Sequence, residues 1–320
     1  MSLLERELAM FSVKRDRAFW LKITPVFFVS ALSSLSAYAE HENDGVNPGW
    51  NLCRSTNPDE RIRGCDQVIS EAAKETKHNQ LAAYINRASA YQTKGDLSKA
   101  ILDYSKALEI DASSLVALSA RGAAYYAKKE FDKAIADYSQ IIDHDKSNVS
   151  ALLARAAAWR SQGNNEKSLN DLTQAAKLEK KNNGPFLARG ALYHALGEHD
   201  KAISDYSEAL RRDAKNTLAY NGRGACYYAK SLYDKALADF DAALKIDEKY
   251  IAALVNRANA WRGKKDFTRA KADYDSALVL KPGLPAAEQG SQDMARLLAK
   301  KAAGEPVSSD KAPKLVHDHD

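Results

Sequence analysis

The ten residues "KAILDYSKAL" (99–108) recur along this 320-residue chain. The stretches "KAIADYSQII" (133–142), "KAISDYSEAL" (201–210) and "KALADFDAAL" (235–244) keep the same order of apolar, acidic and aromatic residues. Each copy begins 34 residues, or a multiple of 34 residues, after the first one. A fixed period of this length is typical of repeat architectures, in which every repeat is one supersecondary unit.

Four further positions share this period: a Gly or Ala, an aromatic residue three positions later, an Ala nine positions after that, and a second aromatic. In the first copy these residues are Ala88, Tyr91, Ala100 and Tyr104. Spacings of three and four residues within two segments predict a pair of amphipathic helices in each repeat. The segments are separated by "TKGD", "SQGN" or "ALGE", and we expect the glycine to end the first helix in a left-handed conformation.

This pattern resembles the tetratricopeptide repeat (TPR) family, and in particular its exported bacterial members. One pair of helices cannot bury its apolar face alone, so neighbouring pairs must stack. The resemblance implies an all-α fold, a right-handed superhelical α-solenoid of helix-turn-helix units. Six tandem repeats are expected at 81–114, 115–148, 149–182, 183–216, 217–250 and 251–284. The third copy departs from the pattern, with Ser168 and Leu172 in place of alanine and an aromatic residue.

Residues 1–39 have the three parts of a secretory signal peptide. A basic flank precedes the short apolar run "ITPVFFVSAL" (23–32), and "AYA" (37–39) places small residues before Glu40. We expect cleavage before Glu40, which would make the protein periplasmic or secreted. The alternative is that the segment is retained and anchors the protein to a membrane.

The segments that flank the repeats are expected to close the array. Residues 40–80 are interpreted as an N-terminal capping half-repeat, in which "RIRGCDQVI" (61–69) imitates a second helix with Cys65 in the aromatic position. An oxidising compartment favours a disulfide between Cys53 and Cys65, although two unrelated thiols remain the alternative. Residues 285–301 are expected to form a C-terminal capping helix, and 302–320 a disordered tail.

An arginine and an aspartate sixteen residues later recur in every repeat. The pairs are Arg87 and Asp103, Arg121 and Asp137, Arg155 and Asp171, Arg189 and Asp205, Arg223 and Asp239, and Arg257 and Asp273. They predict a structural ladder of ion pairs, because the planar guanidinium can engage a carboxylate through two hydrogen bonds. Two rows of solvated charges, or an arginine row that binds a ligand, are the alternatives. The sequence leaves open whether each pair forms within a repeat or between repeats.

Other classes of function find no support in the sequence. The net charge of +5 is spread along the chain without a basic block, which argues against nucleic acid as a partner. No motif of a hydrolase, metalloprotease, nucleotide-binding or dinucleotide-binding enzyme is present, so neither an enzyme nor a cofactor is expected. "HDHD" (317–320) lacks the fixed geometry of a metal site, His194 is expected to be solvated or to line the binding surface, and Cys226 is expected to pack as a small residue.

The remaining candidate is a binding surface. In the TPR family the first helices line the concave face, where a partner peptide lies. The resemblance places there Gln92, Tyr126, Arg160, His194, Tyr228 and Arg262, with mostly small residues one turn earlier and Asn259 among them. Such a surface suits an extended or helical segment with acidic or aromatic side chains, unless these residues are merely solvated.

The leading hypothesis is therefore a non-enzymatic scaffold that binds a protein or peptide partner. A module that binds polysaccharide or the cell envelope, and a membrane-anchored assembly factor, are the alternatives.

Overall fold

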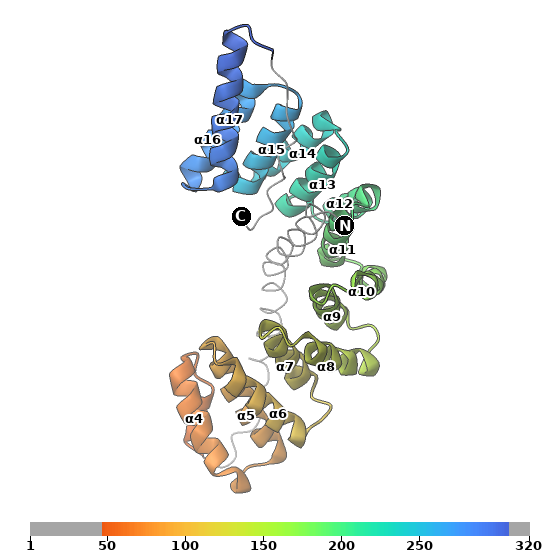
Figure 1. Ribbon diagram of the computed structural model, residues 1–320. Coiled ribbons are helices and arrows are strands. Elements are labelled where there is room, and N and C mark those ends of the chain that lie inside the picture. The colour runs from red at the N-terminus through yellow and green to blue at the C-terminus, as the bar shows by residue number, and fades with distance from the viewer. Residues whose placement is uncertain (1–46, 307–320) are drawn as a thin grey trace, which may run out of the picture. The chain divides into compact units, whose positions relative to one another are not determined.

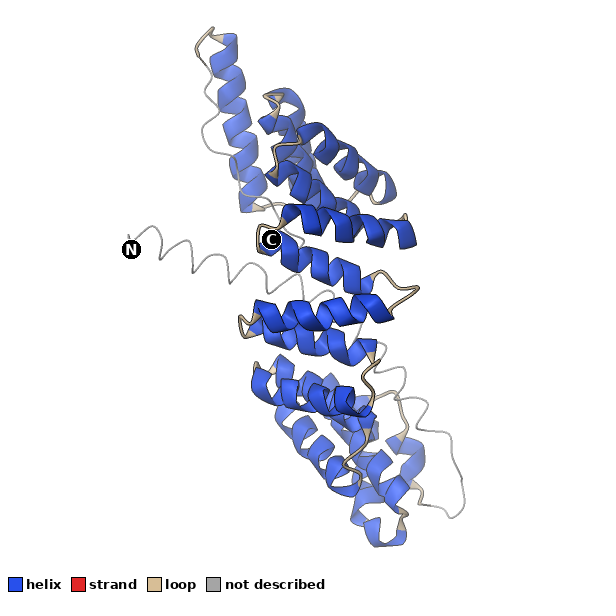
Figure 2. Ribbon diagram, turned by 90° about the vertical axis from the view of Figure 1, so that its right-hand side faces the viewer, coloured by secondary structure: helices blue, strands red, loops and turns tan. Residues whose placement is uncertain are grey.

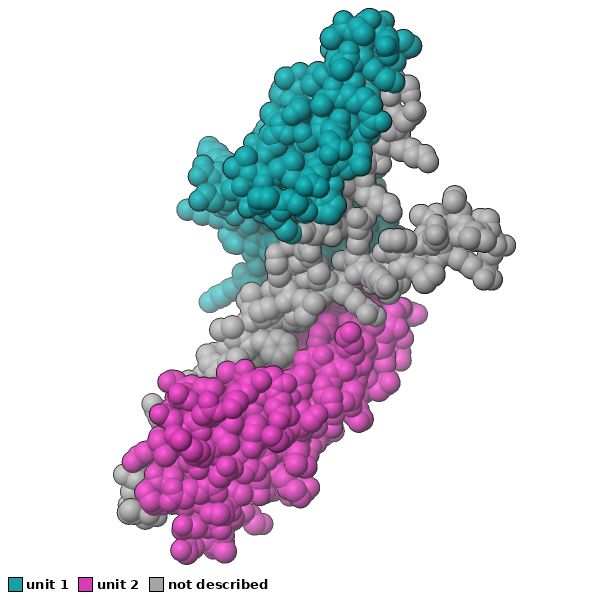
Figure 3. Space-filling view, turned by 60° about the vertical axis from the view of Figure 1, so that its left-hand side comes forward, with its two compact units in different colours: residues 1–21, 179–320 teal, residues 22–178 magenta. Residues whose placement is uncertain are grey.

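The computed structural model describes residues 47–306, which form two compact units, 47–178 and 179–306 (Figure 3). The predicted signal peptide, the start of the capping segment at 40–46 and the end of the tail at 307–320 lie outside the described residues. All regular elements between residues 47 and 306 are helices (Figure 2), which confirms the all-α class of stacked helix-turn-helix units. Within this range, none of the helices combines the length and the apolar character needed to cross a lipid bilayer.

The first unit begins with the short helix α3 (Gly49–Cys53), the helix α4 (Pro58–Ser70) and one 3-10 turn (Ala72–Lys74). Three helix pairs follow: α5 (Lys77–Thr93) with α6 (Leu97–Ile110), α7 (Leu115–Ala127) with α8 (Phe131–His144), and α9 (Val149–Ser161) with α10 (Asn165–Leu178).

The second unit contains three more pairs and a final helix. These are α11 (Gly184–Ala195) with α12 (His199–Arg212), α13 (Thr217–Ala229) with α14 (Tyr233–Ile246), α15 (Ile251–Gly263) with α16 (Phe267–Leu280), and α17 (Pro285–Ala302).

Consecutive helices pack against each other within each unit (Figure 1). Neighbouring first helices also contact one another: α5 contacts α7, and α11 contacts α13. Neighbouring second helices are further apart. The first helices therefore form the inner side of each stack, and side chains at one repeat position recur along that side.

The conserved spacing of small and aromatic residues produces the core between paired helices. A methyl group added at Gly224 would lie 2.7 Å from the ring of Phe240, so the aromatic ring fills the space that the missing side chain leaves. The departures in the third repeat keep apolar contact in the core: Leu172 is fully buried in the aromatic position. Ser168 is also buried, and its hydroxyl donates to the carbonyl of Ala156 at 2.8 Å, which satisfies the polar atom.

The turn between paired helices adopts the left-handed conformation in all six repeats. The expectation is confirmed at Gly95, Gly163 and Gly197, where φ is 80°, 87° and 78°. The same place in the other repeats is occupied by Lys129, Ser231 and Lys265, with φ of 64°, 58° and 63°. A side chain in this region costs roughly 1–2 kcal/mol relative to the right-handed region. The packing of the paired helices therefore imposes the turn even where the residue disfavours it.

We expect Lys129→Gly to raise the free energy of unfolding by about 0.5–1 kcal/mol, because the relief of left-handed strain exceeds the added entropy of the unfolded chain. The matched change Gly163→Ala should lower it by about 1 kcal/mol. Urea denaturation of the full chain measures both changes. A lower stability for Lys129→Gly would contradict the account of the turn.

Candidate functional site

The arginine and aspartate of each repeat form a two-pronged contact between the paired helices. In the second repeat, Nε of Arg121 donates to Oδ2 of Asp137 at 3.0 Å, and Nη2 donates to Oδ1 at 2.7 Å. The other five pairs repeat this geometry, with donor–acceptor distances between 2.7 and 2.9 Å. The carboxylate pairing is therefore within a repeat, and it uses the guanidinium fork that a lysine lacks.

The third guanidinium nitrogen contacts the preceding second helix. Nη1 of Arg121 donates to the hydroxyl of Ser105 at 3.0 Å. Equivalent contacts join Arg155 to Ser139, Arg223 to Ser207, Arg257 to Asp241 and Arg87 to Asp66, at 3.0, 3.0, 2.7 and 2.6 Å. Each of these arginines consequently connects three helices and two neighbouring repeats. The acceptor directly follows the residue at the core aromatic position of the preceding unit, which for Arg87 is Cys65. The sequence shows this regularity only once the contact is known.

Burial sets the energetics of the pairs. The six aspartates are between 2% and 7% exposed. Hydrogen bonding to Asp137 raises the pKa of Arg121, while burial raises the pKa of Asp137 itself. The desolvation of the Asp137 carboxylate thus offsets part of the stabilisation that the pair provides. Such a pair adds little net stability, but removal of one partner leaves a buried charge uncompensated.

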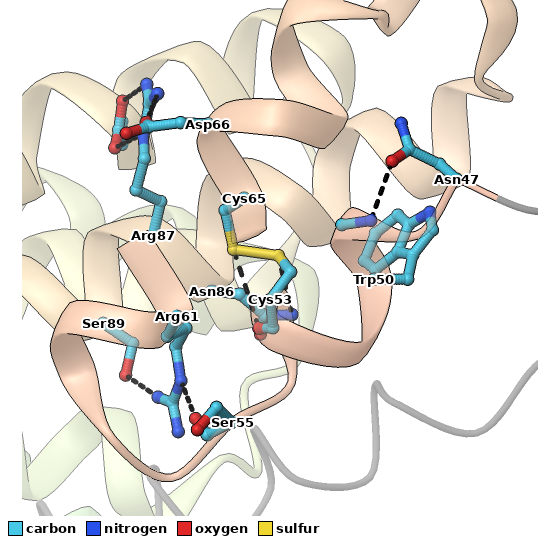
Figure 4. Close-up of a disulfide and its surroundings, with 12 residues drawn as sticks. Asn47, Trp50, Cys53, Ser55, Arg61, Cys65, Asp66, Asn86, Arg87 and Ser89 are labelled. Carbon is cyan, nitrogen blue, oxygen red and sulfur yellow. Dashed lines mark hydrogen bonds and ion pairs between the residues drawn. A yellow bond between two sulfur atoms is a disulfide. The ribbon is translucent and has the colours of Figure 1, made fainter. Parts of the chain in front are cut away.

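The N-terminal end of the array is closed by a disulfide (Figure 4). Cys53 of α3 and Cys65 of α4 are bonded, and both are fully buried. A loop of this length stabilises the fold by roughly 3 kcal/mol in the chain-entropy model. Asp66, the residue after Cys65, accepts from Arg87, just as Ser105, the residue after Tyr104, accepts from Arg121. Cys65 therefore takes the place of a core aromatic residue.

The predicted partner-binding residues lie on the first helices, three in the first unit and four in the second, and most also contact a neighbouring repeat or helix. Gln92 accepts a hydrogen bond from the hydroxyl of Tyr104 at 3.1 Å, and Tyr126 shares one with Ser161 at 3.0 Å. Gln92, Tyr126, Arg160, His194 and Arg262 are partly exposed. The row is thus a half-buried surface in which contacts within the protein hold the side chains.

Two residues of the predicted surface are buried. Tyr228 is 8% exposed, and burial raises its pKa to about 12. Asn259 is 1% exposed and accepts a hydrogen bond from the hydroxyl of Tyr274 at 2.5 Å. The structure places Asn259 as a support for the core tyrosine, because its amide points to the paired helix.

A cation covers the first-helix aromatic residue in all six repeats. The cation belongs to the residue that precedes the core alanine, or Ser168 in the third repeat. It lies between 3.8 and 5.6 Å from the ring centroid. The pairs are Tyr91 and Lys99, Tyr125 and Lys133, Trp159 and Lys167, Tyr193 and Lys201, Tyr227 and Lys235, and Trp261 and Arg269. The spacing of eight residues is visible in the sequence, but only the structure shows that the cation lies over the ring.

Comparison with protein families identifies the repeat. Models described as tetratricopeptide repeat match residues 81–114, 119–185 and 217–250, and one described as TPR repeat matches 190–231. Together these matches span about half of the 320 residues. The chain belongs to the tetratricopeptide repeat family, whose members typically serve as interaction scaffolds rather than enzymes.

Solved structures share the fold at low sequence identity. A TPR protein from Parabacteroides merdae aligns with a TM-score of 0.58 at 16% identity, over 78% of this chain and 96% of that one. The C-terminal part of a TPR protein from Cytophaga hutchinsonii gives 0.62 at 17% identity, over 76% and 98%. The pilF protein of Pseudomonas aeruginosa gives 0.57 at 19% identity, over 68% and 100%. No curated protein matches the chain by sequence.

We expect Arg121→Met to lower the free energy of unfolding by about 3–5 kcal/mol, because Asp137 then stays buried without its cation. The double variant Arg121→Met/Asp137→Leu should recover most of this loss, and Arg121→Lys should fall between, since it keeps the charge but not the fork. Chemical denaturation of the full chain provides the comparison. A double variant as unstable as Arg121→Met would show that the buried carboxylate is not the cause.

Proposed function

We propose that this protein is a non-enzymatic scaffold that binds a peptide segment or partner protein along the first helices, and that it acts in the periplasm. The main support for this proposal is a row of partly exposed aromatic, cationic and amide side chains, which recurs at one position of successive first helices. In residues 47–178 this row consists of Gln92, Tyr126 and Arg160, on helices that contact one another.

The chemistry of the row indicates the kind of partner. Ser89, Ala123 and Ala157, one turn earlier, are small and buried, so a partner backbone can approach the helices closely. Tyr126 offers a ring and Arg160 a planar cation beside this floor. Such a set recognises acidic or aromatic side chains on an extended or helical segment.

The cation–π row favours this proposal over a polysaccharide-binding module. Stacking on a sugar ring requires an open aromatic face. One face of each first-helix Tyr or Trp is already covered by a lysine or arginine, as at Trp159, where Nζ of Lys167 lies 4.2 Å from the ring centroid. These rings therefore pack against the second helix of their own repeat.

Export is supported by the N-terminal sequence and by the disulfide, since disulfides persist in oxidising compartments. The proposal includes cleavage before Glu40. Retention of residues 1–39 would instead make the protein a membrane-anchored assembly factor.

The test is crosslinking and mass spectrometry of the full-length protein in its own cells. We expect the exported chain to start at Glu40 by intact mass and to crosslink to a partner segment. Arg160→Glu, on the first-helix row, should abolish that crosslink. Lys177→Glu, the same reversal of charge on the exposed surface of α10, should leave it unchanged.

Two outcomes would contradict the proposal. One is a crosslink equally sensitive to both substitutions, which would indicate general electrostatics. The other is retention of the protein by purified envelope glycans with no protein partner, which would favour the polysaccharide-binding alternative. Circular dichroism of both variants controls for unfolding.

A further inference from the structure

Three neighbouring side chains of the second unit, His194, His199 and Cys226, are of residue types that no other repeat has at the same positions. His194 and His199 stand where two other repeats pair aromatic rings, Tyr126 with Phe131 and Tyr228 with Tyr233. Cys226 occupies the slot that holds Ala90, Ala124, Ala158, Leu192 and Ala260 elsewhere. The other repeats pack without a histidine or cysteine at these positions, so packing alone does not require these residues.

The fold brings these three residues together although Cys226 belongs to the next repeat. His194 lies near the end of α11, His199 begins α12, and Cys226 lies in α13. Nδ1 of His194 is 3.2 Å from Sγ of Cys226, and one nitrogen or sulfur atom from each residue lies within 4.8 Å of the others. The two imidazole rings are tilted at 47° with centroids 5.2 Å apart. The donor atoms therefore converge on one point from three helices.

We propose that His194, His199 and Cys226 bind a zinc ion. Imidazole nitrogen and thiolate sulfur are the donors that zinc prefers, and a tetrahedral ion bound at about 2.0–2.3 Å separates its ligand atoms by roughly 3.5 Å. The pair at 3.2 Å is already close to this value. A rotation of the His199 side chain that moves its ligand nitrogen by about 1 Å would complete a three-ligand site.

The surroundings are compatible with a cation. Nδ1 of His199 is buried and makes no hydrogen bond with any residue between 47 and 306, whereas nearly all buried polar atoms have a partner. Burial lowers the pKa of His199, which favours the neutral, metal-binding form. Burial also raises the pKa of Cys226 to about 12, so zinc has to displace the thiol proton. Lys230 is close to His199, but an ion pair with Asp200 balances its charge.

The proposed ion would connect the fourth repeat to the fifth on the inner side of the stack. His194 belongs to the row of partner-facing positions, and both histidines are partly exposed. Three protein ligands leave one position of a tetrahedral ion for water or for a donor side chain of a bound partner. The site is independent of the proposed scaffold function, because zinc binding is measured on the isolated chain.

The repeat supplies matched variants that should fold. Cys226→Ala restores the residue found in four other copies, and the double variant His194→Tyr/His199→Phe restores the ring pair of Tyr126 and Phe131. His317→Ala/His319→Ala removes the histidines of the C-terminal tail and controls for weak binding there. The protein used is the untagged full-length chain with the Cys53–Cys65 disulfide intact, which leaves Cys226 as its one free thiol.

Titration with Zn²⁺ by calorimetry should show one ion per chain, and Co²⁺ should give the absorption of a thiolate-bound tetrahedral ion. Cys226→Ala should abolish the thiolate absorption and weaken zinc binding by at least about 100-fold, beyond the loss caused by altering an outer-shell group. Zinc should raise the melting temperature of the unaltered chain and of the tail variant, but not of the ligand variants.

The proposal is overturned if the unaltered chain binds no zinc, if zinc binding survives in Cys226→Ala with the same affinity, or if it disappears only in the tail variant. Circular dichroism that shows the ligand variants to be folded ensures that lost binding reports the site.

Discussion

The guanidinium group of each first helix determines how the repeats fit together. It donates two hydrogen bonds to a buried carboxylate of its own repeat. Arg87, Arg121, Arg155, Arg223 and Arg257 donate a third to the residue that follows the preceding core aromatic position. A helix shifted by one residue would separate the fork from its carboxylate and leave both charges in a poorly solvated place. Because the desolvation of the aspartate offsets much of the attraction, we infer that the ladder selects one register more than it adds stability.

Small residues, aromatic rings and the left-handed turn act in the same direction. The aromatic ring occupies the space beside a glycine or alanine, and the turn reverses the chain over a few residues. Lys129 accepts an unfavourable φ of 64° because the helices on both sides are fixed by this packing. At the turn, the conformational preference of glycine and the packing of the helices agree in three repeats. In the other three, packing imposes the left-handed conformation on a residue that disfavours it.

The helical pairs could be predicted from the sequence because each depends on spacing within about thirty residues. The Arg–Asp pairing was also predictable, as both positions recur in step. The third contact was not, since its acceptor is a serine in some repeats and an aspartate in others, and these residues share only a place in the fold. His199 was missed for a related reason: its relation to Cys226 becomes visible only when departures from the repeat are superposed in space. Asn259, expected on the surface, turned inward because a core tyrosine hydroxyl needs an acceptor. The contacts that recur in every repeat hold the helices in place. The side chains that differ from repeat to repeat are then the ones that can give the protein its binding properties.

The most direct measurement is the exchange of the arginine Nε–H protons with deuterated solvent, followed by NMR on the full-length chain. In each ladder arginine this proton is donated to a buried carboxylate oxygen. The account predicts that the Nε–H signals of the six ladder arginines exchange slowly, protected far beyond those of exposed arginines such as Arg211 and Arg269. Exchange of all arginine signals at the rate of exposed side chains would show that the fork is not closed in solution and would contradict the ladder as the constraint on register.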